Sequence, residues 1–228
     1  MQALIYTLAP VTAVILGAVV ATRTTLKPGM VSALQHLAAG VVFAAAATEI
    51  LPQVKHEASP AATLIGGAAG VATMLALKGF ETRFKGPLAL LAAVGIDILV
   101  DGVVLGLAFV AGERAGFLLT IALTLEVLFL GLSLTGELAE AYRSRLRIVA
   151  IVAALALLLP IGALAAIPVA TLSPVMIAGF LSFGLMALLY LVTEELLVEA
   201  HEKPDSPLIS AMFFIGFLAL LTLEEIMG

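Results

Sequence analysis

Long apolar runs separated by short polar breaks extend along the whole chain. Every run reaches the roughly 20 residues that an α-helix needs to cross the hydrocarbon core of a bilayer. The breaks contain proline, glycine and charged residues, which end helices and favour turns. The pattern therefore predicts eight membrane-spanning helices, at residues 2–22, 30–54, 59–80, 87–112, 115–138, 146–169, 173–200 and 206–227.

The composition agrees with a helical membrane protein. The sequence is 62% hydrophobic and 12% charged, whereas soluble domains are about half apolar and a quarter charged. A membrane β-barrel would show segments of about ten residues that alternate apolar and polar positions, and the runs here are continuous instead. We expect an all-α integral membrane protein in which residues 1–228 form a single eight-helix transmembrane domain. Pro160 is expected to kink the sixth span.

Basic residues indicate the orientation of the chain, because cytoplasmic loops carry an excess of lysine and arginine. With the amino terminus outside, only Lys55 and Arg114 lie outside. The other basic residues then lie inside: Arg23, Lys27, Lys78, Arg83, Lys85, Arg143, Arg145, Arg147 and Lys203. We therefore expect a multi-pass protein of a cell membrane, such as the bacterial inner membrane, with both termini outside. The net charge of -5 argues against a nucleic-acid partner.

The ends of the second and seventh spans resemble each other. Residues 48–57 read TEILPQVKHE and residues 193–202 read TEELLVEAHE, so Thr, Glu, Leu, His and Glu recur at matching positions. In the predicted topology the second span runs outward and the seventh runs inward. The similarity therefore predicts an inverted repeat of helices 1–3 and 6–8, which is typical of secondary transporters with a site near the midplane.

Three acids lie near the middle of the fourth and fifth predicted spans. Asp97 and Asp101 are one turn apart, on one face of their helix, and Glu126 is at the middle of the next span. An acid at the centre of a membrane helix has an insertion free energy of about +2.5 kcal/mol or more, and no lysine or arginine is expected at this depth. The acids must be protonated, hydrated or neutralised by a bound cation. We expect Asp97, Asp101 and Glu126 to bind a metal cation, with neutral, hydrogen-bonded acids as the alternative. Gly102 and Gly106 beside them predict close helix packing.

Other acids and histidines lie nearer the ends of their spans. Those that we expect to mark a cation pathway or a secondary metal site are Glu49, Glu194, Glu195, Glu199, His201 and Glu202. Glu224 and Glu225, at the outer end of the last span, are expected to assist an ion that enters past Glu49. Solvated interfacial residues are the alternative for several of these acids and histidines. His36 is expected to be interfacial only.

Over essentially its whole length the chain resembles the ZIP family of zinc- and iron-regulated-transporter-like proteins. The resemblance is strongest in AAGVVFAAAATEILPQ (residues 38–53) and LLYLVTEELLVEAHE (residues 188–202). Both look like the family's helix of small residues that ends in an acidic Glu-Leu-x-Pro stretch. The resemblance implies eight spans, both termini outside, an inverted repeat of helices 1–3 and 6–8, and a metal centre on helices 4 and 5.

The family's metal centre comes from His-Asn-x-Pro-Glu-Gly on the fourth span and His-x-x-Pro-Glu-Gly on the fifth. In the alignment that the glycines imply, Asp97 takes a His position, Asp101 a Glu position and Glu126 the second His position. Leu130 replaces the remaining Glu, both motif prolines and the Asn are absent, and residues 146–169 contain no acid. The resemblance therefore implies a single all-oxygen site rather than a two-metal centre.

The resemblance implies transport of a divalent metal ion by alternating access. Zinc is the first expectation from the family, and manganese, iron, magnesium and cadmium stay open. Carboxylates and water suit Mg²⁺, Mn²⁺ or Ca²⁺, although zinc also accepts Asp and Glu. The expected partners are the lipid bilayer and metal ions, with a homodimer as the candidate assembly. A proton-coupled carrier of a small solute and a non-transporting metal-sensing membrane protein remain alternatives. We do not expect an enzyme, because no histidine or cysteine is predicted at membrane depth to complete a hydrolytic metal site.

Overall fold

The structure is a computed structural model and describes residues 2–24, 27–56, 59–83, 86–202 and 206–227. Within these ranges the chain forms helices and no strand, and eight helices are long and apolar enough to cross a membrane. The predicted all-helical architecture and number of spans are confirmed for this part of the chain. This architecture is that of a multi-pass membrane protein. Lys85 and Lys203, used above for the orientation, and Glu57, used for the repeat, lie outside the described residues.

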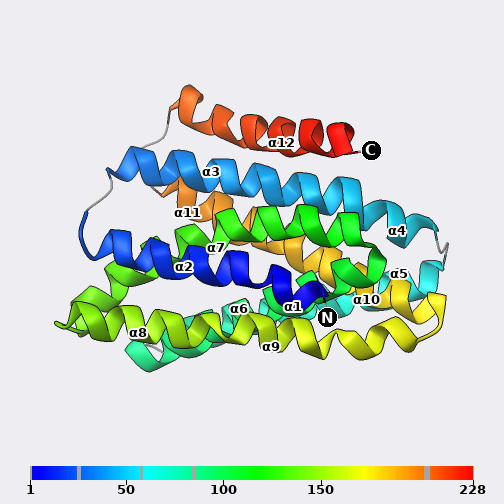
Figure 1. The fold of residues 1–228 in the computed structure, drawn as a ribbon, viewed down its shortest axis with the longest axis horizontal. Coiled ribbons are helices and arrows are strands. Elements are labelled where there is room, and N and C mark those ends of the chain that lie inside the picture. The colour runs from blue at the N-terminus through cyan, green and yellow to red at the C-terminus, as the bar shows by residue number, and fades with distance from the viewer. Residues whose placement is uncertain (1, 25–26, 57–58, 84–85, 203–205, 228) are drawn as a thin grey trace.

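The predicted spans agree with the observed ones to within a few residues. The observed spans are Gln2–Ala21, Pro28–His56, Pro60–Phe80, Pro87–Ala111, Glu113–Ala141, Arg145–Thr171, Pro174–His201 and Pro207–Met227. Their elements in chain order are α1 (Gln2–Tyr6), α2 (Leu8–Ala21), α3 (Pro28–Ala45), η1 (Ala46–Ile50), α4 (Leu51–His56), α5 (Pro60–Arg83), α6 (Pro87–Ala111), α7 (Glu113–Ala141), α8 (Arg145–Ala156), α9 (Leu158–Ala165), η2 (Ile167–Thr171), α10 (Pro174–Tyr190), η3 (Leu191–Leu196), α11 (Leu197–His201) and α12 (Pro207–Met227). In Figure 1 they form an elongated bundle, with α1 and the last turns of α12 toward the same end.

Prolines interrupt the first and sixth spans, one turn after each break. Pro160 has no N–H to bond the carbonyl of Ala156, and α8 ends at Ala156. Pro10 stands in the same relation to Tyr6, where α1 ends. The interruption expected at Pro160 is therefore present. It falls at Leu157, directly after the carbonyl of Ala156 that Pro160 cannot bond.

Four helix pairs form most of the bundle: α2 with α7, α3 with α12, α5 with α10, and α6 with α9 (Figure 1). Glycine brings the backbones together in all four of them. A Cβ at Gly17 would overlap the carbonyl oxygen of Leu128 on α7, and a Cβ at Gly102 would overlap that of Leu159 on α9. Small residues permit this close approach in membrane helices. The helix contact predicted at Gly102 is confirmed.

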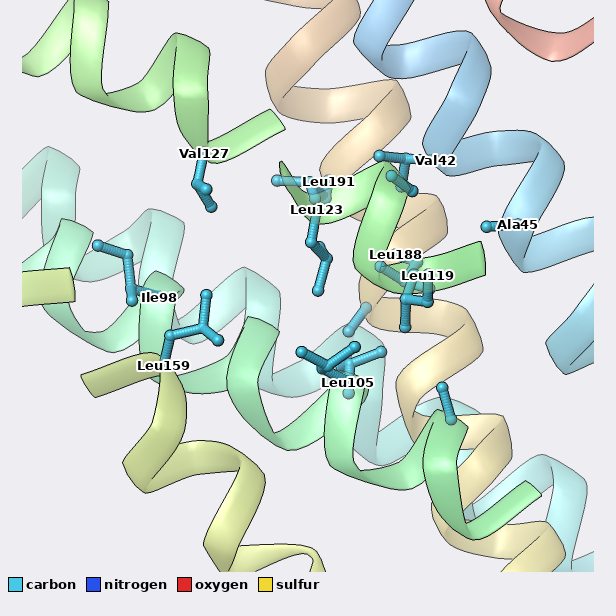
Figure 2. Packing of buried hydrophobic residues seen from close by; sticks show 14 of the residues in the cluster. Val42, Ala45, Ile98, Leu105, Leu119, Leu123, Val127, Leu159, Leu188 and Leu191 are labelled. Carbon is cyan, nitrogen blue, oxygen red and sulfur yellow. The ribbon is translucent and has the colours of Figure 1, made fainter. Parts of the chain in front are cut away.

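Apolar side chains fill the centre of the bundle, where α3, α6, α7, α9 and α10 meet (Figure 2). Leu105 of α6 and Leu119 and Leu123 of α7 are fully buried there. The outer surface is apolar as well, with Leu64 of α5 73% exposed and Leu208 of α12 78% exposed. An apolar surface outside a packed apolar core suits lipid rather than water.

Two π-helical turns lie at corresponding places in the second and seventh spans. Turn η1 contains Thr48 and Glu49, and turn η3 contains Thr193 and Glu194, the residues that begin the two similar stretches of sequence. A π turn holds more residues than an α turn, so it changes which side chains face a given neighbour, and such turns are frequent at functional sites.

Candidate metal centre

Helices α6 and α7 bring three carboxylates together inside the bundle. Asp97 and Asp101 are one turn apart on α6, and Glu126 is on α7, which packs against it. One ligand oxygen from each lies within 4.8 Å of the others. A group of this kind could hold a metal ion, and its members are the three acids named from the sequence.

The two deeper acids are almost completely enclosed. Asp101 is 4% exposed and Glu126 is 3% exposed, and Oδ2 of Asp101 and Oε2 of Glu126 make no hydrogen bond with any described residue. A buried polar group without a partner raises the free energy of the folded state by about 1–3 kcal/mol, and by more if it is charged. A cation bound between the acids could serve as the partner of both atoms.

A cavity of about 430 Å³ leads from these acids to one end of the bundle. That end, here called the cavity end, is where α6 begins and where α7 and α11 end, and the exposed Glu137 and Glu199 line the cavity there. Asp97 and Glu126 line its inner part. Among the described lining residues there is no lysine, arginine or histidine, so acids are the only ionisable side chains in this part of the wall.

The opposite end, here called the Arg114 end, is closed by apolar packing and by ion pairs. Leu123 and Leu119 follow Glu126 toward this end of α7 and are fully buried. Beyond them, Nε of Arg114 lies 3.5 Å from Oε1 of Glu49, and its Nη2 lies 3.2 Å from Oε1 of Glu224. Nη2 also donates a 2.7 Å hydrogen bond to the carbonyl oxygen of Glu224. Arg114 thus joins α7 to η1 and α12, and these contacts lie at the end of the bundle opposite the cavity.

The remaining residues predicted for a pathway divide into three groups. Glu195 and Glu199 line the cavity, and Nε2 of Gln35 donates a 2.6 Å hydrogen bond to Oε2 of Glu199. Glu49 belongs to the ion-pair cluster at the Arg114 end. Three others are exposed and are not among the residues that line the cavity: Glu194, His201 and Glu202.

His36 is not interfacial, and that expectation from the sequence is wrong. The side chain is 1% exposed, its Nδ1 lies 2.9 Å from the carbonyl oxygen of Ser32, and its ring centroid lies 4.9 Å from that of His201. Ser32, Gln35 and His36 share a face of α3, packed on α11. This polar face at helical spacing was the signal in the sequence for a buried polar contact between helices.

The fold and this group of acids describe a multi-pass membrane protein with buried oxygen ligands suited to a metal ion. Three carboxylates provide hard ligands of the kind that Mg²⁺, Mn²⁺ and Ca²⁺ prefer, and zinc also accepts Asp and Glu. Comparisons of the chain with protein-family models and with curated proteins find no match.

Proposed function

We propose that this protein carries divalent metal cations across the membrane by alternating access, through one carboxylate site near the bilayer midplane. The observation that carries the proposal is the pair of enclosed acids Asp101 and Glu126, within ligand distance of each other and of Asp97, at the inner end of an acidic cavity. Intramembrane acids without a basic partner usually mark an ion pathway. The resemblance to the ZIP family agrees with this function.

We infer that the cavity end faces the cytoplasm. The positive-inside distribution of lysine and arginine supports this orientation, with both termini outside. A cation then enters at the Arg114 end, exchanges part of its water for Asp97, Asp101 and Glu126, and leaves through the cavity past Glu195 and Glu199. Because the ion must displace protons from acids that are neutral without it, binding is coupled to proton release.

An inverted repeat gives this mechanism its structural basis. In such a repeat the first span corresponds to the sixth, the second to the seventh, the third to the eighth and the fourth to the fifth. The pair α2–α7 then corresponds to α9–α6, and the pair α3–α12 corresponds to α10–α5. These are the four principal pairs of the bundle. The reciprocal glycine contacts follow the same rule, since Gly17 meets Leu128 as Gly162 meets Leu99. Such repeats let the two halves rock about a fixed central site.

The ligand set and the family resemblance favour different cargoes. Zinc follows from the resemblance, whereas three carboxylates without imidazole or thiolate favour manganese, magnesium or iron, and cadmium is a useful probe. We propose a single site that binds one divalent ion at a time.

The proposal is tested by uptake into proteoliposomes, one metal at a time. The wild-type protein is compared with Asp97→Ala and Glu126→Ala, and with Glu140→Ala, which changes an exposed acid of α7 that does not line the cavity. We expect the two site variants to lose uptake and Glu140→Ala to keep it. Equal uptake by all four proteins would reject the site. Solute uptake that depends on a proton gradient and on no metal would favour a proton-coupled carrier, and metal binding without flux would favour a sensor.

A further inference from the structure

A fourth acid stands beside the three candidate ligands. Glu195 of η3 is half-buried and lines the same cavity as Asp97 and Glu126. Its carboxylate is close enough for its charge to act on both Asp101 and Glu126. These are the two acids whose buried oxygens Oδ2 and Oε2 make no hydrogen bond with any described residue. Glu195 therefore approaches the group from a helix that contributes none of its three acids.

Three carboxylates leave part of the coordination sphere of a divalent cation to other ligands. Mg²⁺ takes about six oxygens and Ca²⁺ takes six to eight. Water can reach the ion from the cavity, and Glu195 lines the same cavity. The other acids of the wall are farther along it: Glu199 is one turn beyond Glu195 and is hydrogen-bonded by Gln35, and Glu137 is exposed near the end of α7. Glu195 is thus the acid between the enclosed group and the mouth of the cavity.

Only one of two neighbouring glutamates in the π turn η3 lines the cavity. Leu191, Glu195 and Glu199 line it, whereas Glu194 is exposed and is not among the residues that do. Adjacent residues of a helix point about 100° apart, and the wider turn of η3 rotates the residues after it relative to those before it. Glu195 therefore lies on the cavity face of η3, whereas Glu194 lies on an exposed face.

We propose that Glu195 is a fourth ligand of the transported cation, which it binds together with Asp101 and Glu126 and releases into the cavity. The inference rests on the function proposed above. It predicts that a bound metal ion carries one fewer water molecule than the three other carboxylates alone would leave. It also predicts that the ligand set joins three helical segments, so that movement of η3 away from α6 and α7 opens the coordination sphere.

The test uses Mn²⁺ as the probe of the purified full-length protein in lipid nanodiscs. Electron paramagnetic resonance of free Mn²⁺ gives the affinity and the number of sites, and water-proton relaxation gives the number of exchanging water molecules on the bound ion. We expect Glu195→Ala to raise the Kd by about tenfold or more, since affinity follows the charge count of the ligands, and to add one water molecule. Glu194→Ala is the matched control on the same turn and should change neither quantity.

The outcomes separate this inference from the proposed function. If the wild-type protein binds no Mn²⁺ and takes up no divalent metal, the function itself fails. If it binds one Mn²⁺ and Glu195→Ala shows the same water count, the inference fails and the function stands, whatever happens to the affinity, because an effect of distant charge alone adds no water. Glu195→Asp keeps a carboxylate and should bind more tightly than Glu195→Ala, which provides a second comparison if the alanine variant does not fold.

Discussion

At the scale of single residues, Asp101 is expected to serve metal binding at a cost to the stability of the fold. An enclosed acid destabilises the fold when it is ionised, and replacing it with a neutral amide of similar shape removes the cost of burying that charge. We therefore expect Asp101→Asn to lower metal uptake by more than about tenfold, as the loss of an intramembrane ionisable ligand should. We expect its melting temperature to equal or exceed that of the wild-type protein. Uptake by proteoliposomes and circular dichroism at 222 nm measure the two effects.

The control for this prediction is Glu140→Gln, an equivalent change at an exposed position of α7 that does not line the cavity. It should alter neither uptake nor the melting temperature. A large fall in the melting temperature of Asp101→Asn would show that the carboxylate supports the fold through contacts of its own, and would weaken the assignment of Asp101 as a ligand.

Acidity should oppose metal binding at the same residues. A metal ion binds carboxylates in their ionised form, so protons compete with it. Once the pH is below the range in which a carboxylate titrates, each proton that the metal displaces raises the apparent Kd about tenfold for every further unit of pH. We expect the Kd for Mn²⁺ to rise steadily between pH 7.5 and pH 5.5 in the wild-type protein, and we expect protons to be released when Mn²⁺ is added in weak buffer. A Kd independent of pH, with no proton release, would contradict binding by these acids.

The three acids could be predicted from the sequence because their depth and helical spacing are local properties. Asp97 and Asp101 share a face of one span, and a single short loop fixes Glu126 at the same depth. Contacts that depend on tertiary packing could not be predicted in this way. Arg114 pairs with Glu49 and Glu224, which are distant in the chain, and His36 is buried by a helix that follows it by most of the sequence.

At the scale of elements, the ends of the spans were predictable and their interiors were less so. Proline, glycine and charge at the breaks mark the boundaries directly. Inside the spans, the break at Leu157 follows from the carbonyl that Pro160 leaves without a donor. The two π turns had no such signal, since Pro52 follows η1 closely but Leu197 occupies the matching position after η3. The different environments of Glu194 and Glu195 were therefore not predictable from periodicity.

Close packing of α6 on α9 fixes the helix that carries two of the acids. A Cβ at Gly102 would overlap the carbonyl oxygen of Leu159, so Gly102→Ala must push the helices apart. We expect it to lower the free energy of unfolding by about 1–3 kcal/mol and to weaken Mn²⁺ binding. Gly136→Ala on α7 is the matched control, because a Cβ there meets nothing within 4 Å, and it should be neutral or stabilising by up to about 1 kcal/mol. Thermal unfolding of the two variants compares them, and equal stability would contradict the tight contact.

At the scale of the whole molecule, access to the acids is one-sided. The cavity end is open, and the Arg114 end is closed by leucine packing and ion pairs. In the proposed repeat Asp97 corresponds to Glu126, and so Val104 of α6 corresponds to Ser133 of α7. Ser133 lines the cavity, whereas Val104 is 2% exposed and packs beside Gly184 of α10. A transporter that alternates between two states should expose these two positions in turn.

Single cysteines can report this exchange, because the chain contains none. We expect Ser133→Cys to react with an impermeant maleimide from the cavity end, and Val104→Cys to react slowly from the Arg114 end. Adding Arg114→Gln should raise the rate at Val104→Cys by about fivefold, since ion pairs of this kind contribute up to about 1 kcal/mol, and should lower the rate at Ser133→Cys. Lys55→Gln removes another basic residue that the topology puts at the same end and should change neither rate. If Arg114→Gln raised both rates together, the ion pairs would only hold the bundle compact, whereas opposite changes require two states that open at opposite ends.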